Sequence, residues 1–182
     1  LGYAFIDAKD IMVFNDNGDF EAELTNEKVK SALAGIERAV VPGFYGGDEA
    51  GIVRTFSRGG SDVSGAVIAR AVGASLYENW TDVNGFMSAD PRIVSNPKPI
   101  ETLSYKELRE LAYMGANVLH PESIFPVRIS KIPINIRNTF CPTADGTMIV
   151  AELSEEELGK RVITGIAGKK GYSIVYIEKS MM

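Results

Sequence analysis

The sequence has few of the residues that most often carry thiol, metal or disulfide chemistry. Its 182 residues include one cysteine and one histidine. A single cysteine, Cys141, excludes an internal disulfide and is compatible with a reducing compartment, which favours a cytoplasmic protein. Since no residue near Cys141 in the sequence would activate its thiol, we expect it to be an ordinary loop residue, and no metal site is predicted.

Long apolar runs and basic blocks are also absent. No apolar stretch approaches the roughly 20 residues of a membrane-spanning helix, so no membrane partner is expected. The net charge is −5 and no dense group of Lys and Arg occurs, which argues against a nucleic-acid partner. A composition of 45% apolar and 24% charged residues is typical of one globular domain, or of one domain with part of another.

Short β-type runs alternate with helical patterns along most of the chain. The β-type runs are residues 3–7, 11–15, 39–41, 51–56, 74–80 and 132–138, and the helical patterns are 25–36, 61–73, 104–116 and 121–130. Thr25 or Asn26 would cap the first helix, and Ser104 with Glu107 would form a capping box on the third. This alternation predicts an α/β fold, a three-layer αβα sandwich with a largely parallel sheet.

The composition changes at SEEELGKR, residues 154–161. This stretch indicates a linker or a short charged turn. Beyond it, two β-rich runs flank a Gly/Lys turn, and two strands alone cannot form an independent domain. We therefore expect a first domain over 1–152, a linker over 153–161, and the start of a second module over 162–182.

The first polar cluster is TFSRGGSD, residues 55–62, between an apolar run and a helix rich in small residues. Gly59 and Gly60 would let a ligand approach the backbone closely. Arg58 offers a planar set of donors that suits a carboxylate or phosphate, and Ser61 or Asp62 would cap the helix. The unpaired N–H groups of a helix start also favour anions. The alternative is a tight strand–helix turn with a surface arginine, and the motif alone leaves both readings open.

The second cluster is WTDVNGFMSADPR, residues 80–92, which directly follows a predicted strand. In open α/β sheets, ligands bind outside the carboxyl ends of the strands, where Thr81 and Asp82 would lie. Arg92, after the stiffening Pro91, could reach the phosphates of a nucleotide. The alternative, a solvated loop with Asx turns, is weakened by the length of the loop.

The third cluster is MGANVLHP, residues 114–121. Gly115 is a natural end for the preceding helix. Asn117 and His120 could line a site, although a histidine before a proline is more often a capping or buried residue than a catalytic one.

Together, FSRGGSD, WTDVNGFMSADPR and MGANVLHP resemble the aspartokinases of the amino acid kinase superfamily in order and spacing, as do FIDAKDIMVFN and VVPGFYG upstream. The tail ITGIAGKKGYSIVYIEKSMM is similar to the first strands of an ACT-like α+β regulatory module. The resemblance implies ATP-dependent phosphorylation of the L-aspartate side-chain carboxylate to 4-phospho-L-aspartate, with Mg²⁺ bound to the nucleotide. It also implies a homo-oligomer formed through the regulatory region. The reaction is the first step toward lysine, threonine and methionine.

The resemblance also implies a role for each matching residue. Arg58 would hold the carboxylate of the amino-acid substrate, with Gly59, Gly60 and Ser61 beside it. Asp62 would be the catalytic residue, organising the positive groups around the transferring phosphoryl group. The implied nucleotide-binding residues are Thr81, Asp82, Met87, Arg92, Asn117 and Val118. Thr81 and Asp82 would contact the adenosine part, Met87 would lie near the base, and Arg92 would contact the phosphates.

Three departures from the family pattern limit these expectations. Many relatives have Lys at the position of Asn117, and a neutral amide cannot neutralise phosphate charge. Some relatives have Tyr at Met87. The KFGGTS-type segment of the family is not found in these residues, so we expect the nucleotide-side half of a kinase domain, which alone would bind nucleotide weakly and transfer no phosphate. Two alternatives stay open, a superfamily member acting on another carboxylate or carbamate, and a non-catalytic nucleotide-binding module.

Overall fold

The computed structural model describes residues 2–57, 59–115, 118–119, 123–159 and 161–168, and positions 171, 173 and 176. The helices are α1 (Ala8–Ile11), α2 (Ala22–Leu33), α3 (Gly60–Val72), α4 (Tyr105–Tyr113), α5 (Phe125–Ile129) and α6 (Glu155–Gly159). The strands are β1 (Ala4–Phe5), β2 (Ala39–Val40), β3 (Tyr45–Gly47), β4 (Val53–Thr55), β5 (Tyr77–Thr81), β6 (Thr102–Ser104), β7 (Ile134–Asn138) and β8 (Thr147–Val150).

The strands form three sheets. The largest has the order β5-β7-β8-β6, in which β5 pairs with β7 and β6 with β8 in parallel, while β7 and β8 are antiparallel. The other two are a parallel β1–β2 pair and an antiparallel β3–β4 pair. The predicted α/β class with a largely parallel sheet is therefore confirmed, with one antiparallel pairing inside the main sheet.

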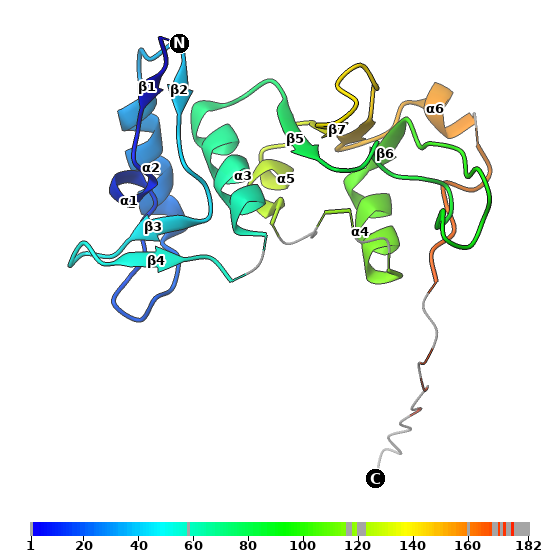
Figure 1. The fold of residues 1–182 in the computed structure, drawn as a ribbon, viewed down its shortest axis with the longest axis horizontal. Helices are drawn as coiled ribbons and strands as arrows, with labels where there is room; N and C mark the ends of the chain where they lie inside the picture. Colours follow the sequence, from blue (N-terminus) through cyan, green and yellow to red (C-terminus); the bar gives the residue numbers. More distant parts are fainter. Residues whose placement is uncertain are drawn as a thin grey trace.

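Helix α3 lies between the part that contains α1 and α2 and the part that contains β5 and β7 (Figure 1). It contributes residues to two hydrophobic cores. The larger core is built on the main sheet and includes Ala66 and Ala69 of α3. The smaller core surrounds α1 and α2 and includes Val67 and Ala71 of the same helix. A helix that is apolar on most sides is expected to be buried between layers, so the small apolar residues of this stretch fit its central place.

Several local predictions need correction. Neither Thr25 nor Asn26 caps a helix, because α2 begins at Ala22 and Thr25 lies inside it. The buried hydroxyl of Thr25 instead accepts a hydrogen bond from the Val13 N–H at 2.9 Å. Part of the predicted strand at 11–15 belongs to helix α1, and only Val13 and Phe14 form isolated bridges.

The C-terminal part also differs from the prediction. The predicted charged linker forms helix α6, whose start is stabilised by reciprocal bonds between Ser154 and Glu157. The first predicted β run of the tail is not a strand in its described part, residues 161–168. The second β run lies mostly outside the described residues. By contrast, the capping box of Ser104 and Glu107 on α4 is confirmed.

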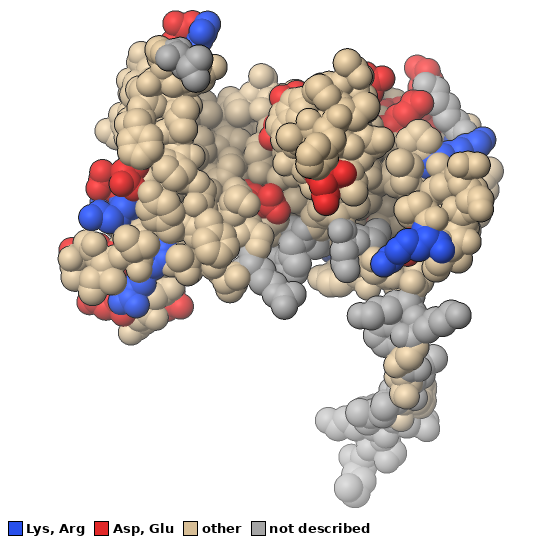
Figure 2. Space-filling model, viewed as in Figure 1, with Lys and Arg blue, Asp and Glu red and all other residues tan. Residues whose placement is uncertain are grey.

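The surface shows no extended region of one charge on the face drawn in Figure 2, where acidic and basic side chains lie in small separate groups. Among the residues that the structure describes, no helix is both long enough and apolar enough to cross a membrane.

Candidate functional site

The glycine pair at the start of α3 is required by the local geometry. Gly59 has φ 57°, in the left-handed region that favours glycine, and it occupies the N-cap position. Gly60 is buried, and a Cβ there would lie 2.5 Å from the Phe44 ring and 2.8 Å from the Cβ of Phe56. Larger residues would therefore push the 42–44 loop away from the start of the helix.

Phe44 is itself held in an unusual conformation. Its φ is 80°, which is rare for a residue with a bulky side chain. Its N–H donates to Ser64 Oγ at 3.0 Å, and Ser64 Oγ donates to the Gly60 carbonyl at 2.9 Å. The first turn of α3 thus fixes the 42–44 loop, and such strained positions often cluster at functional sites.

Asp62 connects α3 to the strand beside it. Neither Ser61 nor Asp62 caps the helix as predicted, because the cap position is Gly59 and no side chain bonds there. The Asp62 carboxylate instead accepts a hydrogen bond from Asn79 Nδ2 at 2.9 Å. Asp62 is half-buried, whereas Ser61 is exposed. The bond from Asn79 means that strand β5 orients the Asp62 carboxylate.

Tyr77 completes this connection. Its hydroxyl donates to the Asp62 carbonyl at 3.3 Å and accepts from Asn79 Nδ2 at 3.1 Å. Burial, with the nearby Asp62 charge, raises the pKa of Tyr77 to about 12, so the hydroxyl stays a donor at neutral pH. Gly65 permits this approach, because a Cβ there would lie 2.7 Å from the Tyr77 hydroxyl oxygen.

The carboxyl ends of β5 and β7 meet at one edge of the main sheet. Thr81 stands opposite Asn138 in the register, and the Thr139 N–H donates to the Thr81 carbonyl at 2.8 Å. Alternation along β5 places Thr81 on the same face as Tyr77 and Asn79. The first and second sequence clusters are therefore joined through a single strand.

The remaining residues of the second cluster lie on the loop after β5. Asp82 is exposed, and its Oδ1 accepts from Thr81 Oγ1 at 3.2 Å. Met87 is half-buried and forms an antiparallel bridge with Pro99. Backbone pairing therefore fixes this part of the loop.

Arg92 is largely exposed and forms an ion pair with Asp90. Arg92 Nη2 and Nε lie 2.7 Å and 3.2 Å from Asp90 Oδ2, and Nε lies 3.0 Å from Oδ1. These bonds hold the pKa of Asp90 below its ordinary value and raise the pKa of Arg92. The arginine is a charged group at the surface, available to a ligand that shares or replaces Asp90.

The third cluster is only partly described. Gly115 has φ 111° and follows Met114, the C-cap of α4, which confirms that the helix ends at this turn. Val118 is half-buried and packs against the larger core. Arg58, Asn117 and His120 lie outside the described residues.

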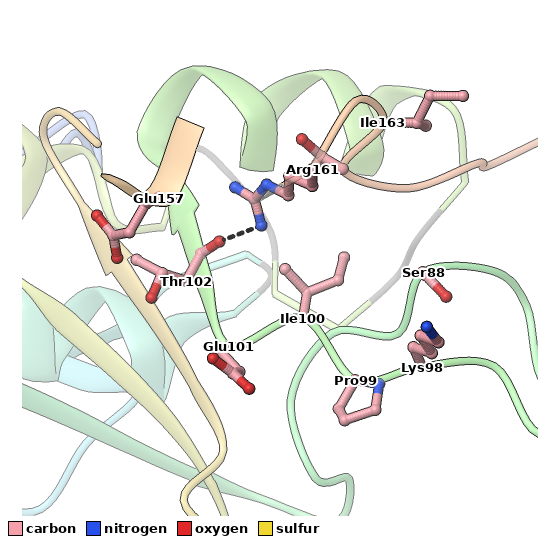
Figure 3. Close-up of a pocket in the computed structure, with 10 residues that line it drawn as sticks. Ser88, Lys98, Pro99, Ile100, Glu101, Thr102, Glu157, Arg161 and Ile163 are labelled. Carbon is pink, nitrogen blue, oxygen red and sulfur yellow. Dashed lines mark hydrogen bonds between the residues drawn. The ribbon is translucent and has the colours of Figure 1, made fainter. Parts of the chain in front are cut away.

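A cavity of about 330 Å³ lies elsewhere, between the 88–102 region and the segment after α6 (Figure 3). Its lining includes Lys98, Glu101, Glu157 and Arg161, and none of the predicted site residues. Figure 3 shows the Arg161 guanidinium directed at the Thr102 carbonyl, to which Nη1 donates at 2.7 Å. This cavity belongs to the contact between the C-terminal segment and the main sheet.

Sequence reasoning missed Asn79 as an orienting group for Asp62. The only signal for it was an amide on the apolar-facing side of a predicted strand. Once the strand is placed against α3, this position is buried and adjacent to the helix start.

Comparison with known proteins places the chain in a family. The chain belongs to the amino acid kinase family, whose model matches residues 5–138. Among curated proteins it is 38% identical to aspartokinase 3 of Bacillus subtilis over 181 residues, which covers 98% of this chain and 39% of that protein. It is 40% identical to aspartokinase 1 of the same organism, over 81% of this chain and 37% of that protein.

Solved structures give the same relationship. The aspartate kinase of Clostridium acetobutylicum has a TM-score of 0.76 and 57% identity, over 80% of this chain and 33% of that one. Escherichia coli aspartokinase III in complex with aspartate and ADP has a TM-score of 0.75 and 31% identity, over 85% of this chain and 36% of that one. The chain thus spans well under half the length of these relatives.

Proposed function

We propose that this chain provides part of the active site of an aspartokinase. The reaction transfers the γ-phosphoryl group of ATP to the side-chain carboxylate of L-aspartate and gives 4-phospho-L-aspartate and ADP, the first step toward lysine, threonine and methionine. One observation carries the proposal. Asp62, at the glycine-rich start of α3, is oriented through Asn79 by the strand that ends at Thr81, directly before Asp82. The similarity to aspartokinases supports aspartate as the acceptor.

The chemistry asks for positioning and charge stabilisation. A carboxylate oxygen of aspartate attacks the γ-phosphorus, and the bond from that phosphorus to the β,γ-bridging oxygen breaks as ADP leaves. The attacking carboxylate is already ionised, so no general base is needed. Arg58 would hold a carboxylate of the substrate beside Gly59, Gly60 and Ser61, and Asp62 would orient the positive groups around the phosphoryl group.

The nucleotide would lie along the edge where β5 and β7 end. Thr81 and Asp82 would contact the adenosine part, and Met87 would lie near the base. Arg92 would contact the phosphates by sharing or exchanging its bonds to Asp90. We propose Asn117 and Val118 as further nucleotide contacts, made through the backbone.

Mg²⁺ would be bound together with the nucleotide. In the part of the chain that the structure describes, no group of three or more His, Cys, Asp or Glu residues could hold a metal ion. The proposed ion would be held by phosphate oxygens and water, with one or two carboxylates at most, as Mg²⁺ usually is in kinases. When bound, Mg²⁺ neutralises part of the phosphate charge.

The proposal includes a division of the chain. Residues 1–152 would belong to the amino acid kinase domain, 153–161 would connect it, and 162–182 would begin an ACT-like regulatory region. That region would carry the contacts of a homo-oligomer. A cytoplasmic location stays a prediction.

The test uses a chimera of B. subtilis aspartokinase 3 in which these 182 residues replace the matching stretch. We expect Asp62→Asn to lower kcat by about 100-fold, because an oriented charge near the transferring group would be lost. The ATP KM should change little. Asp16→Asn is the control, because Asp16 is exposed and distant in sequence from Asp62.

Each outcome separates the alternatives. Near-normal turnover by the Asp62→Asn chimera would make Asp62 a structural residue of α3 and contradict the proposed role. Turnover with another carboxylate or a carbamate, but not with aspartate, would assign a different member of the superfamily. If the 182-residue chain binds ADP in calorimetry but the chimera has no kinase activity, the chain would be assigned as a non-catalytic nucleotide-binding module.

A further inference from the structure

The loop after β5 is held at both ends by groups from neighbouring strands. At its start, the Thr81 carbonyl accepts from the Thr139 N–H at 2.8 Å. At its far end, the Phe86 N–H donates to Thr147 Oγ1 at 2.8 Å, and the Phe86 side chain is buried in the larger core. The exposed residues between these ends include Asp82.

One side chain holds the middle of this loop. Asn138, the last residue of β7, donates from Nδ2 to Asn84 Oδ1 at 2.7 Å. Its own Oδ1 accepts from the Phe140 N–H at 2.8 Å. Asn138 is 8% exposed, so its amide is buried with both ends bonded.

These two bonds have different consequences. The bond from Phe140 closes a local Asx turn and would exist in any chain that turned after β7. The bond to Asn84 joins positions 54 residues apart in sequence. It determines where the backbone lies two residues after Asp82, which no local turn requires.

We propose that Asn138 is a positioning residue for nucleotide binding, acting through Asn84 on the loop that carries Thr81 and Asp82. This inference rests on the proposed function, because it assigns the adenosine part of the nucleotide to that loop. Asn138 itself does not contact the ligand. It fixes the loop so that the ordering of Asp82 is complete before the nucleotide binds, which lowers the entropic cost of binding.

The test uses the complementary chemistry of two amides. In Asn84→Asp, a carboxylate oxygen still accepts from Asn138 Nδ2. In Asn138→Asp, the Asn84 amide can rotate and donate its NH₂ to the new carboxylate. In the double variant, two carboxylates face each other and no donor is left, so the contact becomes repulsive.

The measurement is the ADP dissociation constant of the 182-residue chain by calorimetry, with Mg²⁺, alongside the thermal midpoint. We expect each single variant to stay within about threefold of the unmodified chain. If the two changes acted independently, the fold increases in the ADP dissociation constant of the single variants would multiply. In the double variant, we expect that constant to exceed this product by at least about tenfold. That comparison removes the general effect of added negative charge, which both single variants also carry.

Losses that simply multiply in the double variant would overturn the inference. Should the double variant fail to fold, Asn84→Ala decides, because it removes the acceptor at an exposed position without adding charge. It should weaken ADP binding by at least about fivefold while far-UV circular dichroism shows that the chain is still folded, although the thermal midpoint falls because the buried Asn138 donor loses its partner. Unchanged binding would overturn the inference. If the unmodified chain binds ADP too weakly to measure, the variants are compared in the chimera. If the chimera binds no ADP either, the proposed function fails and this inference with it. If it binds and the variants bind equally well, only the inference fails.

Discussion

Asn79 is a polar side chain on the buried face of β5, and its position is explained by what it bonds. Its Nδ2 donates to the Asp62 carboxylate and to the Tyr77 hydroxyl. A buried donor that is satisfied costs little, whereas removing it would leave a half-buried carboxylate with one bond fewer. The amide is therefore as much a part of the Asp62 site as the glycines before it.

We expect Asn79→Leu to lower the free energy of unfolding by about 1–3 kcal/mol, because Asp62 loses its donor. In the chimera, the same change should lower kcat, since Asp62 would no longer be oriented. Tyr77→Phe is the matched control, because it removes a hydroxyl but keeps the bond between Asn79 and Asp62. Denaturant unfolding and steady-state kinetics provide the measurements, and equal kcat losses in both variants would contradict an orienting role for Asn79.

At the residue scale, local patterns predicted the capping box of α4 but misplaced the caps of α2 and α3. Gly59 and Gly60 could be assigned to a tight turn because their role depends on neighbouring residues. Asn79 and Asn138 could not be assigned, because their partners lie 17 and 54 residues away and are identified only when the strands are placed. The roles of Asp62, Thr81 and Arg92 stay predictions.

Glu107, in the first turn of helix α4, makes two kinds of contact. Glu107 forms the capping box with Ser104, as the spacing predicted. Its carboxylate also accepts hydrogen bonds from Arg161 Nη2 at 3.3 Å and 3.4 Å and from Thr164 Oγ1. The second kind of contact was not predictable, because Arg161 ends the segment that the sequence indicated as a linker and Thr164 follows it. One carboxylate therefore holds the C-terminal segment on the main body.

Glu107→Gln should release this segment while keeping the helix start, because Gln can still serve in a capping box but cannot pair with Arg161 as an ion. We expect faster hydrogen exchange at the Ile166 N–H, which donates to the Ser88 carbonyl at 2.8 Å. Glu110→Gln, on the exposed side of the same helix, is the control. Unchanged exchange at Ile166 would mean that the segment is held without Glu107.

The same contact should depend on pH. Burial alone would raise the pKa of Glu107, but the hydrogen bonds from Thr164 and Ser104 and the Arg161 charge lower it below its ordinary value of 4.5. A lowered pKa in the folded protein means that the ionised carboxylate stabilises the contact above about pH 4.5, and that this stabilisation is lost as pH falls through the lowered value. The Thr164 methyl signal in NMR should titrate with a midpoint below 4.5, and the titration should be absent in Glu107→Gln.

At the scale of the whole molecule, α3 contributes buried residues to both hydrophobic cores. The alternation of helical and β-type runs was enough to predict the α/β class. It could not predict that β7 and β8 are antiparallel, because strand direction depends on connections rather than on periodicity. Nor could it show that successive residues of one helix, Ala66 and Val67, belong to different cores.

Because α3 joins the two cores, we expect them to unfold together. Val67→Ala would create a space in the smaller core and should lower the free energy of unfolding by about 1–3 kcal/mol. Trp80 lies on β5, on the other side of α3, and its fluorescence should report the same shift in midpoint as far-UV circular dichroism. Val72→Ala, at an exposed position of the same helix, is the control. Two separate transitions would show that the cores are independent.

The place of α3 in both cores has a consequence for how the chain folds during synthesis on the ribosome. Ala8, Ile11 and Val29 are buried in the smaller core, yet that core also needs Val67 and Ala71. A growing chain that ends before residue 60 has none of α3 to cover these side chains. The part of this surface that α3 covers therefore stays exposed until α3 has left the exit tunnel. At about 5–20 residues per second, synthesis of the missing stretch takes a few seconds, and this is the interval in which a chaperone that recognises apolar segments would act on the chain.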